Sequence, residues 1–181
     1  FEREGNVIWV SGNSPVQTGK MFEVNIEYEG QPTIAKRAPW DGGFDWKKDE
    51  NGNPWIGVSC EGIGASIWWP NKDHLYDEPD SMHIGITVPK GLMAISNGNL
   101  ESEFVLEDGK TTYNWKVNYP INNYNVSLYI GKYVHFKDVY AGSEGEYDLD
   151  YYVLEYNLEK AKKQFQQVKP MFDCYEKFLG P

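Results

Sequence analysis

An acidic residue beside two glycines is the first candidate for chemistry in this chain. Glu61 follows an apolar run that ends at Cys60, and Gly62 and Gly64 come shortly after it. A strand that ends on a carboxylate and then bends through glycines can present that carboxylate at a sheet edge or a cleft wall. Glu61 is therefore a candidate binding residue; the alternative is a solvated acid at a strand end.

Metal chemistry has no comparable signal in the sequence. His74, His83 and His135 each lack a second histidine four residues away, so the H-E-x-x-H zinc motif is absent. The acids and asparagines between Asp41 and Asn53 do not have the spacing of a calcium-binding loop. We expect this chain to bind no metal ion, and we expect a surface hairpin with its tip at Asn51-Gly52.

The tryptophans raise a competing hypothesis. Five of them fall within about thirty residues, namely Trp40, Trp46, Trp55, Trp68 and Trp69, and residues 39–46 are typical of an exposed loop. Flat rings displayed on a β scaffold could bind sugars by stacking, and such a module would expose Trp40, Trp46 or Trp55. The preferred interpretation is that these rings form a local core or contact another domain.

Composition excludes several classes of partner. The chain has 27 acidic and 17 basic residues in 181, a net charge of −10, which argues against binding to nucleic acid or to anionic membranes. No apolar run approaches the roughly 18 residues of a membrane span, and no signal peptide is recognisable in this sequence. Cys60 and Cys174 are expected to be free, partly buried thiols. The cellular compartment stays open.

Alternating apolar and polar residues predict a mainly β fold. In the segment 21–28, Phe22, Val24 and Ile26 share one face, as in a half-buried strand. Further strands are predicted at 7–10, 55–60, 83–88, 92–96, 102–106, 111–119, 126–130, 133–139 and 149–156. Turn signals at Asn51-Gly52, Asn97-Gly98, Asp108-Gly109 and 142–145 separate them, which favours antiparallel pairing.

The end of the chain has the pattern of a helix. An apolar stripe recurs at spacings of three and four residues, through Leu158, Ala161, Phe165, Val168, Phe172, Tyr175 and Leu179. Pro170 is expected to kink this helix or to start a second one. The stripe could pack on the β domain or could begin another domain.

Three segments together resemble a known family. They are S-C-E-G-I-G-A-S-I-W-W-P-N-K-D at 59–73, the strand at 83–88, and G-L-M-A-I-S-N-G-N-L at 91–100. This pattern is similar to the N-terminal, non-catalytic domain of the aminopeptidase N family of gluzincin zinc metallopeptidases. The resemblance implies a saddle-like, mixed but mostly antiparallel β domain at 1–156, lacking its first strands. It also implies that 157–181 is the helical start of an absent zinc catalytic domain.

The resemblance also implies roles for individual residues. Glu61 would anchor the amine of the substrate's first residue, and Gly62 and Gly64 would serve the turn and the close approach of ligand. The zinc ligands and the G-x-M-E-N segment of the family would lie in the catalytic domain, so this chain alone is expected to be inactive. Its partners would be a peptide N-terminus and that catalytic domain within one polypeptide. Ser59 stands where relatives often have Gln. The family also has an aromatic-proline element that matches Trp68-Trp69-Pro70 and leads into Asn71-Lys72-Asp73, and we interpret this element as structural.

Two other hypotheses remain open. One is a β-sandwich module that binds a ligand or a carbohydrate. The other is a structural domain of a family member that has lost its zinc site, since a fold does not guarantee a chemistry.

Overall fold

The structure of the 181-residue chain is a computed structural model. It describes residues 1–180 except 63, 73 and 75. The chain divides into two compact units, one spanning Phe1–Gln31 and one beginning at Pro32. In the part of the chain that is described, no helix is long and apolar enough to cross a membrane.

The first unit contains one short hairpin. Strands β1 (Glu2–Glu4) and β2 (Val7–Trp9) pair antiparallel around Gly5. The strand predicted at 21–28 is wrong, because the structure assigns no strand there and Phe22, Val24 and Ile26 are exposed. Alternation marks two faces of a segment, but a strand also needs a neighbouring strand for its backbone hydrogen bonds.

A four-stranded sheet in the second unit carries the candidate site. Its order is β3 (Gly43–Lys48), β4 (Pro54–Ser59), β9 (Leu128–Gly131) and β6 (Met93–Ser96), and all three pairings are antiparallel. The β3–β4 hairpin turns at the predicted Asn51-Gly52. The exposed loop predicted at 39–46 is corrected in its second half, because Gly43 begins β3.

A three-stranded sheet packs on the first through a shared core. Its order is β5 (Met82–Val88), β8 (Thr111–Val117) and β7 (Asn99–Val105), again antiparallel. Val88 and Trp115 of this sheet are buried together with Ala94 of β6. The Trp115 indole Nε1 donates a hydrogen bond to the Ala94 carbonyl at 3.1 Å, which links the two sheets. Asn97-Gly98 therefore joins strands of two different sheets instead of closing a hairpin.

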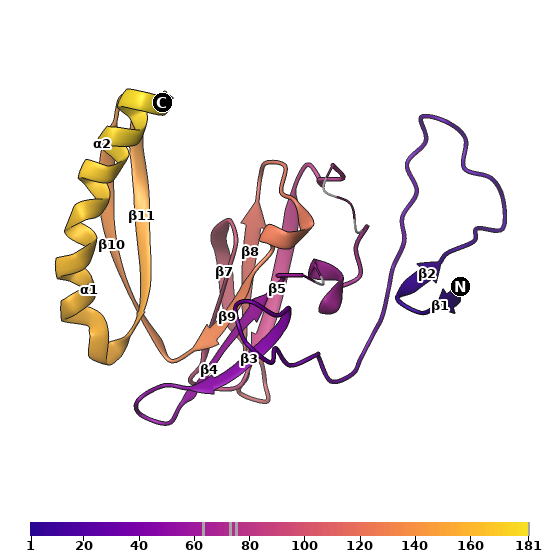
Figure 1. The fold of residues 1–181 in the computed structure, drawn as a ribbon, viewed down its shortest axis with the longest axis horizontal. Coiled ribbons are helices and arrows are strands. Elements are labelled where there is room, and N and C mark those ends of the chain that lie inside the picture. Colours follow the sequence, from indigo (N-terminus) through magenta and orange to yellow (C-terminus); the bar gives the residue numbers. More distant parts are fainter. Residues whose placement is uncertain (63, 73, 75, 181) are drawn as a thin grey trace. The chain divides into compact units, whose positions relative to one another are not determined.

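The C-terminal part is a long hairpin with helices along it. Strands β10 (Tyr133–Gly142) and β11 (Gly145–Leu154) pair antiparallel over their whole length. The 3₁₀ turn η3 (Glu155–Asn157), helix α1 (Leu158–Gln164), a second 3₁₀ turn η4 (Phe165–Gln167) and helix α2 (Val168–Leu179) follow. Both helices run beside the hairpin (Figure 1). Pro170 lies in the first turn of α2, which confirms that it starts a second helix.

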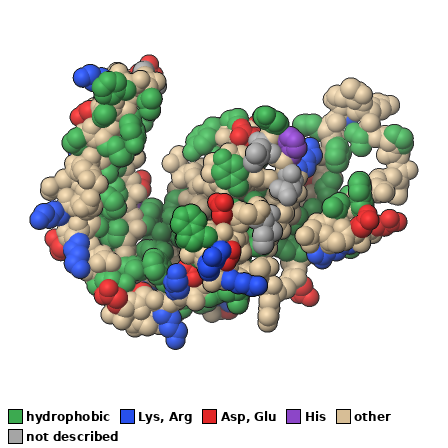
Figure 2. All heavy atoms as spheres, viewed as in Figure 1, with side chains coloured by type: hydrophobic (Ala, Val, Ile, Leu, Met, Phe, Trp, Pro, Cys, Tyr) green, Lys and Arg blue, Asp and Glu red, His purple; other side chains and the backbone are tan. Residues whose placement is uncertain are grey.

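The helical tail is attached to this hairpin by aromatic and polar contacts. The Phe165 ring stacks on Tyr151, with centroids 4.7 Å apart, and Phe172 stacks on Tyr140 at 5.1 Å. The Tyr140 hydroxyl donates to an Asp173 carboxylate oxygen at 3.0 Å. Beyond these contacts the apolar stripe ends at the surface, since Tyr175 and Leu179 are exposed, as is the neighbouring Phe178. Figure 2 shows hydrophobic side chains at the surface along this helical part.

These elements confirm the predicted fold class, a mainly β chain with mostly antiparallel sheets and a C-terminal helical tail. Whether the boundary near residue 157 separates two domains of a larger protein stays a prediction.

Candidate functional site

A turn at the end of β4 carries the predicted site residues. Glu61 and Gly62 form this turn, and the Gly64 amide donates to the Cys60 carbonyl at 2.9 Å. Gly62 and Gly64 adopt φ of 73° and 86°, a region that L side chains rarely occupy. Glycine is needed here because the chain must reverse within four residues of the strand end. Glu61 is exposed on this turn, so its carboxylate can meet a ligand.

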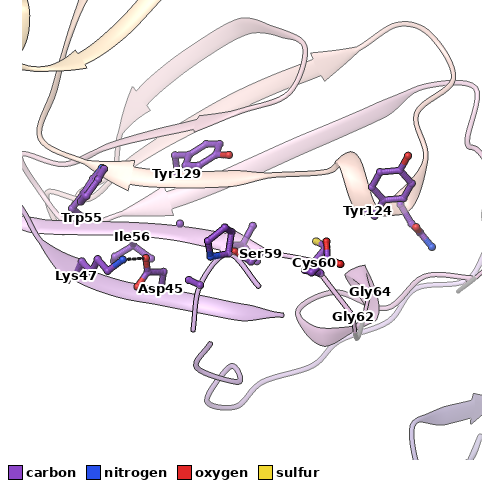
Figure 3. Close-up of a pocket in the computed structure, with 16 residues that line it drawn as sticks. Asp45, Lys47, Trp55, Ile56, Ser59, Cys60, Gly62, Gly64, Tyr124 and Tyr129 are labelled. Carbon is purple, nitrogen blue, oxygen red and sulfur yellow. Dashed lines mark ion pairs between the residues drawn. The ribbon is translucent and has the colours of Figure 1, made fainter. Parts of the chain in front are cut away.

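A cavity of about 710 Å³ adjoins the turn, and Glu61, Gly62 and Gly64 all line it. Its size lies within the range of ligand pockets, roughly 300–1,000 Å³. Figure 3 shows the residues around it. The other lining residues come from the loop before β3, from β3, β4 and β9, and from the segment before β9, namely Ala38, Pro39, Asp45, Lys47, Trp55, Ile56, Gly57, Val58, Ser59, Cys60, Asn123, Tyr124 and Tyr129.

The floor of the cavity is a row of residues across three strands. Gly57 of β4 lies opposite Asp45 of β3 and opposite Tyr129 of β9. Directly opposed residues project from the same face of a sheet. Because Gly57 has no side chain, the Tyr129 ring lies close to the backbone of β4, and Asp45 lies on the other side of Gly57. The Lys47 ammonium pairs with the Asp45 carboxylate at 2.7 Å (Figure 3).

Another wall of the cavity is the 3₁₀ turn η2 (Asn123–Asn125), which has Tyr124 at its centre. Asn123 is buried, and its Nδ2 donates to Asn71 Oδ1 at 3.2 Å and to the Lys72 carbonyl at 2.9 Å. Tyr124 is half exposed and lies beside Cys60, Gly62 and Gly64 (Figure 3). The buried neighbour thus holds the backbone of Tyr124 in place while its ring stays accessible.

The segment 68–73 has the structural role that the sequence indicated. Trp68 and Trp69 pack on the buried cluster of Val117, Ile121 and Val126. Asn71 Nδ2 donates a hydrogen bond to the Trp69 carbonyl at 2.9 Å. The Asn71 side-chain oxygen and the Lys72 carbonyl in turn accept hydrogen bonds from Asn123. Asp73, which belongs to the same motif, lies outside the described residues.

Cys60 lines the cavity but is poorly suited to nucleophilic catalysis. Burial raises the pKa of its thiol, and a hydrogen bond from Trp68 opposes that shift to a smaller extent. A reactive cysteine needs the opposite shift, toward the thiolate. Both cysteines are free, as predicted, although Cys174 is exposed instead of partly buried, because it lies on α2 away from the stripe that contacts the hairpin.

The histidines and acids of the described residues do not assemble a metal site. No group of three or more His, Cys, Asp or Glu side chains there could hold a metal ion. His135 Nε2 lies 2.6 Å from Asp150 Oδ1 across the β10–β11 hairpin, and His83 lies 3.8 Å from Glu101. Asp49 accepts hydrogen bonds from the Asn51 and Asn53 amides, which explains the acidic 41–53 segment as a hairpin turn.

Exposure of the tryptophans divides them into two groups. Trp68 and Trp69 are partly buried, whereas Trp40, Trp46 and Trp55 are 72%, 51% and 42% exposed. Trp46 lies opposite Ile56, the neighbour of Trp55 on β4, so Trp46 and Trp55 project from opposite faces of the sheet. They do not form one stacking platform.

Sequence reasoning missed the residues that surround Glu61 in space. Gly57 lies on β4, which leads to Glu61, whereas Asn123, Tyr124 and Tyr129 are brought near by the β4–β9 pairing, which joins residues more than seventy positions apart. Only the pairing of distant strands could have identified them, and hydrophobic alternation does not encode that pairing.

The fold is that of the N-terminal portion of M1 zinc metallopeptidases. A two-domain M1 zinc metallopeptidase mutant bound to L-arginine matches with a TM-score of 0.62 and 15% identity, over 84% of this chain and 34% of that one. A mutant M1 zinc metallopeptidase from Deinococcus radiodurans matches with a TM-score of 0.59 and 18% identity, over 84% of this chain and 34% of that one. A mutant from that organism bound to a Tyr-Ser-Ala substrate matches with a TM-score of 0.52 and 18% identity, over 67% of this chain and 27% of that one.

These similarities confirm the predicted fold, and the chain spans about a third of the length of those structures. No family model and no curated protein matches the sequence.

Proposed function

We propose that this chain is the amino-terminal domain of a zinc metallo-aminopeptidase, in which it recognises the substrate's terminal amine and supports the catalytic domain. The proposal rests on one observation above all. In a chain with the fold of the M1 N-terminal portion, Glu61 lies on a glycine turn at the rim of a ligand-sized cavity. A carboxylate in that position suits an ammonium group.

The environment of Glu61 supports this role. Among the described residues, none forms a hydrogen bond or ion pair with its side chain, whereas the Asp45 carboxylate of the same cavity is paired with Lys47. Glu61 is thus the carboxylate of the cavity that is available to a cation. In a water-excluded site a charge-assisted hydrogen bond of about 1.5–3 kcal/mol corresponds to roughly 10- to 150-fold in affinity. An ion pair of an exposed carboxylate is worth about 0.2–1 kcal/mol, or roughly 1.4- to 5-fold.

Binding of the amine would also orient the peptide. An enzyme that holds the first residue at a fixed point places the first peptide bond at a fixed distance from its catalytic groups. Those groups, with the zinc ion, are proposed to lie outside this chain, because the described residues provide no metal site. Residues 157–181 are proposed as the start of the catalytic domain, and the chain alone as inactive.

Direct binding to the 181-residue chain tests the proposal. Phenylalaninamide and N-acetylphenylalaninamide differ in whether the amine can carry a charge, and NMR titration measures the dissociation constant of each. Because Glu61 is exposed in this chain, we expect the free amine to bind more tightly by roughly 1.4- to 5-fold. Glu61→Gln should remove most of that preference, whereas Glu107→Gln, in the turn between β7 and β8, should preserve it. Equal binding of the two ligands by the unmodified chain would contradict the proposal.

A carbohydrate-binding module is the second candidate, because Trp40, Trp46 and Trp55 are exposed as that hypothesis requires. Their distribution does not favour it, since Trp46 and Trp55 project from opposite faces. Quenching of tryptophan fluorescence by sugars, and not by free-amine peptides, would support this second function over the first.

A further inference from the structure

We infer that the cavity selects the side chain of the bound terminal residue, and that the rings of Tyr124 and Tyr129 favour a large, apolar, ring-bearing side chain there. This inference rests on the proposed amine anchor at Glu61. It starts from size, because a cavity of about 710 Å³ leaves most of its space free once an ammonium group is bound.

Tyr129 is held by the strand pairing of the sheet. It lies on β9 between β4 and β6, opposite Gly57 on one side and Ile95 on the other. Its ring atoms Cδ1 and Cε1 lie 3.5 and 3.6 Å from the position that a Gly57 β-carbon would occupy. The ring therefore lies against the backbone of β4, and almost half of the residue stays exposed for a ligand.

Tyr124 is nearer to the amine anchor. Its turn is fixed on one side by buried Asn123 and on the other by buried Val126, and the Asn122 side chain accepts a hydrogen bond from the Asn125 amide at 3.1 Å. Figure 3 shows Tyr124 beside Gly62 and Gly64, the glycines that follow Glu61. A side chain attached to an amine at Glu61 would meet this ring first.

The separation of the two rings suits an aromatic ligand. Gly57 precedes Glu61 by four residues, which is at most about 13 Å along a strand. An aromatic side chain that starts at Glu61 and the Tyr129 ring that reaches out over Gly57 can together span this distance. A ligand without a side chain would leave both rings in contact with water alone.

Charge argues against an acidic side chain. The charged residues of the cavity are Glu61, Asp45 and Lys47, and Lys47 is engaged by Asp45 at 2.7 Å. Together they carry one net negative charge. An uncharged apolar side chain meets no repulsion there and gains from contact with the rings.

The test compares three free-amine ligands that differ only in the side chain: glycinamide, phenylalaninamide and glutamic acid α-amide. NMR titration of the full 181-residue chain measures each dissociation constant. We expect phenylalaninamide to bind roughly 10-fold more tightly than glycinamide, and glutamic acid α-amide to bind no better than glycinamide. Equal affinity of glycinamide and phenylalaninamide would overturn the inference.

Two variants locate the selection. Tyr124→Ala should weaken binding of phenylalaninamide by roughly 2- to 12-fold while leaving glycinamide unchanged. Tyr119→Ala is the matched control, because Tyr119 is exposed and does not line the cavity. Gly57→Val places methyl groups against the Tyr129 ring, which must then move, and should also weaken binding of phenylalaninamide alone. If both cavity variants keep the side-chain preference of the unmodified chain, the inference is wrong.

The inference and the proposed function fail in different ways. If N-acetylphenylalaninamide binds as well as phenylalaninamide, the amine anchor is wrong, and the inference built on it falls with it. If the free amine is required but phenylalaninamide binds no better than glycinamide, the amine anchor stands and only the side-chain selection is wrong.

Discussion

The Tyr129 ring lies against Gly57, its partner across the β4–β9 pairing, with Cδ1 3.5 Å from the point where a β-carbon would be. A residue with a side chain at position 57 would occupy the centre of the cavity floor. The absence of that side chain lets the ring lie close to the backbone of β4. The proposed ligand site therefore involves a missing side chain as well as the carboxylate.

Asn123 is expected to position Tyr124. Replacement by alanine removes donors to Asn71 Oδ1 and to the Lys72 carbonyl, and the loss of hydrogen bonds to partly buried acceptors costs about 1–3 kcal/mol. We expect Asn123→Ala to lower the free energy of unfolding by that amount in urea denaturation and to weaken phenylalaninamide binding. Asn114→Ala, which removes a hydrogen bond to Ser102 at the surface, is the control. It should lower the free energy of unfolding by less than about 1 kcal/mol. An unchanged unfolding free energy for Asn123→Ala would contradict the positioning role.

Phe172 should hold α2 on the hairpin. Its ring stacks on Tyr140 at 5.1 Å and is partly buried, so Phe172→Ala should destabilise the contact by about 1.5–3 kcal/mol. Amide hydrogen exchange measures the effect residue by residue. Exchange should quicken in residues 158–179 and change little in β4 and β9. Phe178→Ala, at a ring that is 73% exposed, is the control, and an equal effect of both variants would disprove the docking role of Phe172.

Tyr140 should make the attachment of α2 sensitive to alkaline pH. Burial, followed by the hydrogen bond to the Asp173 carboxylate, raises its pKa to about 12. The folded state therefore retains the phenol proton more strongly than the unfolded chain, whose tyrosines ionise near pH 10. This contribution to stability is fully present below about pH 10 and is lost as the pH rises toward 12.

Between about pH 9 and pH 12, amide hydrogen exchange or circular dichroism should show that helices α1 and α2 become less stable. Tyr140→Phe should lack this pH-dependent loss, whereas Tyr175→Phe, at an exposed tyrosine of α2, should retain it. The same alkaline loss in Tyr140→Phe would assign it to another group.

The sequence predicted those features that depend on neighbours along the chain. Strands 83–88 and 92–96, the second helix that starts near Pro170 and the glycine turn after Glu61 all follow from local pattern, and the structure has them. The alternation at 21–28 was misleading because no other strand pairs with that segment. Gly43–Lys48 was missed because its glycine and aspartate are typical of a loop, although the Asp49 turn pairs it with β4.

The candidate site was predictable only in part. Glu61, Gly62 and Gly64 are adjacent in sequence, and they lie together on one rim of the cavity. Tyr124 and Tyr129 come from a segment at least sixty residues later, which the fold brings to the same cavity. Their role could not be inferred from spacing, because antiparallel pairing between distant strands leaves no regular interval in the sequence.

The coding sequence that follows codon 181 tests the central claim most directly. If this chain is the amino-terminal domain of a zinc aminopeptidase, the reading frame should continue and encode G-x-M-E-N, then H-E-x-x-H, then a further glutamate that completes the zinc site. A stop codon after Pro181, or a continued frame without a zinc motif, would contradict the account and leave a β domain whose function is binding alone.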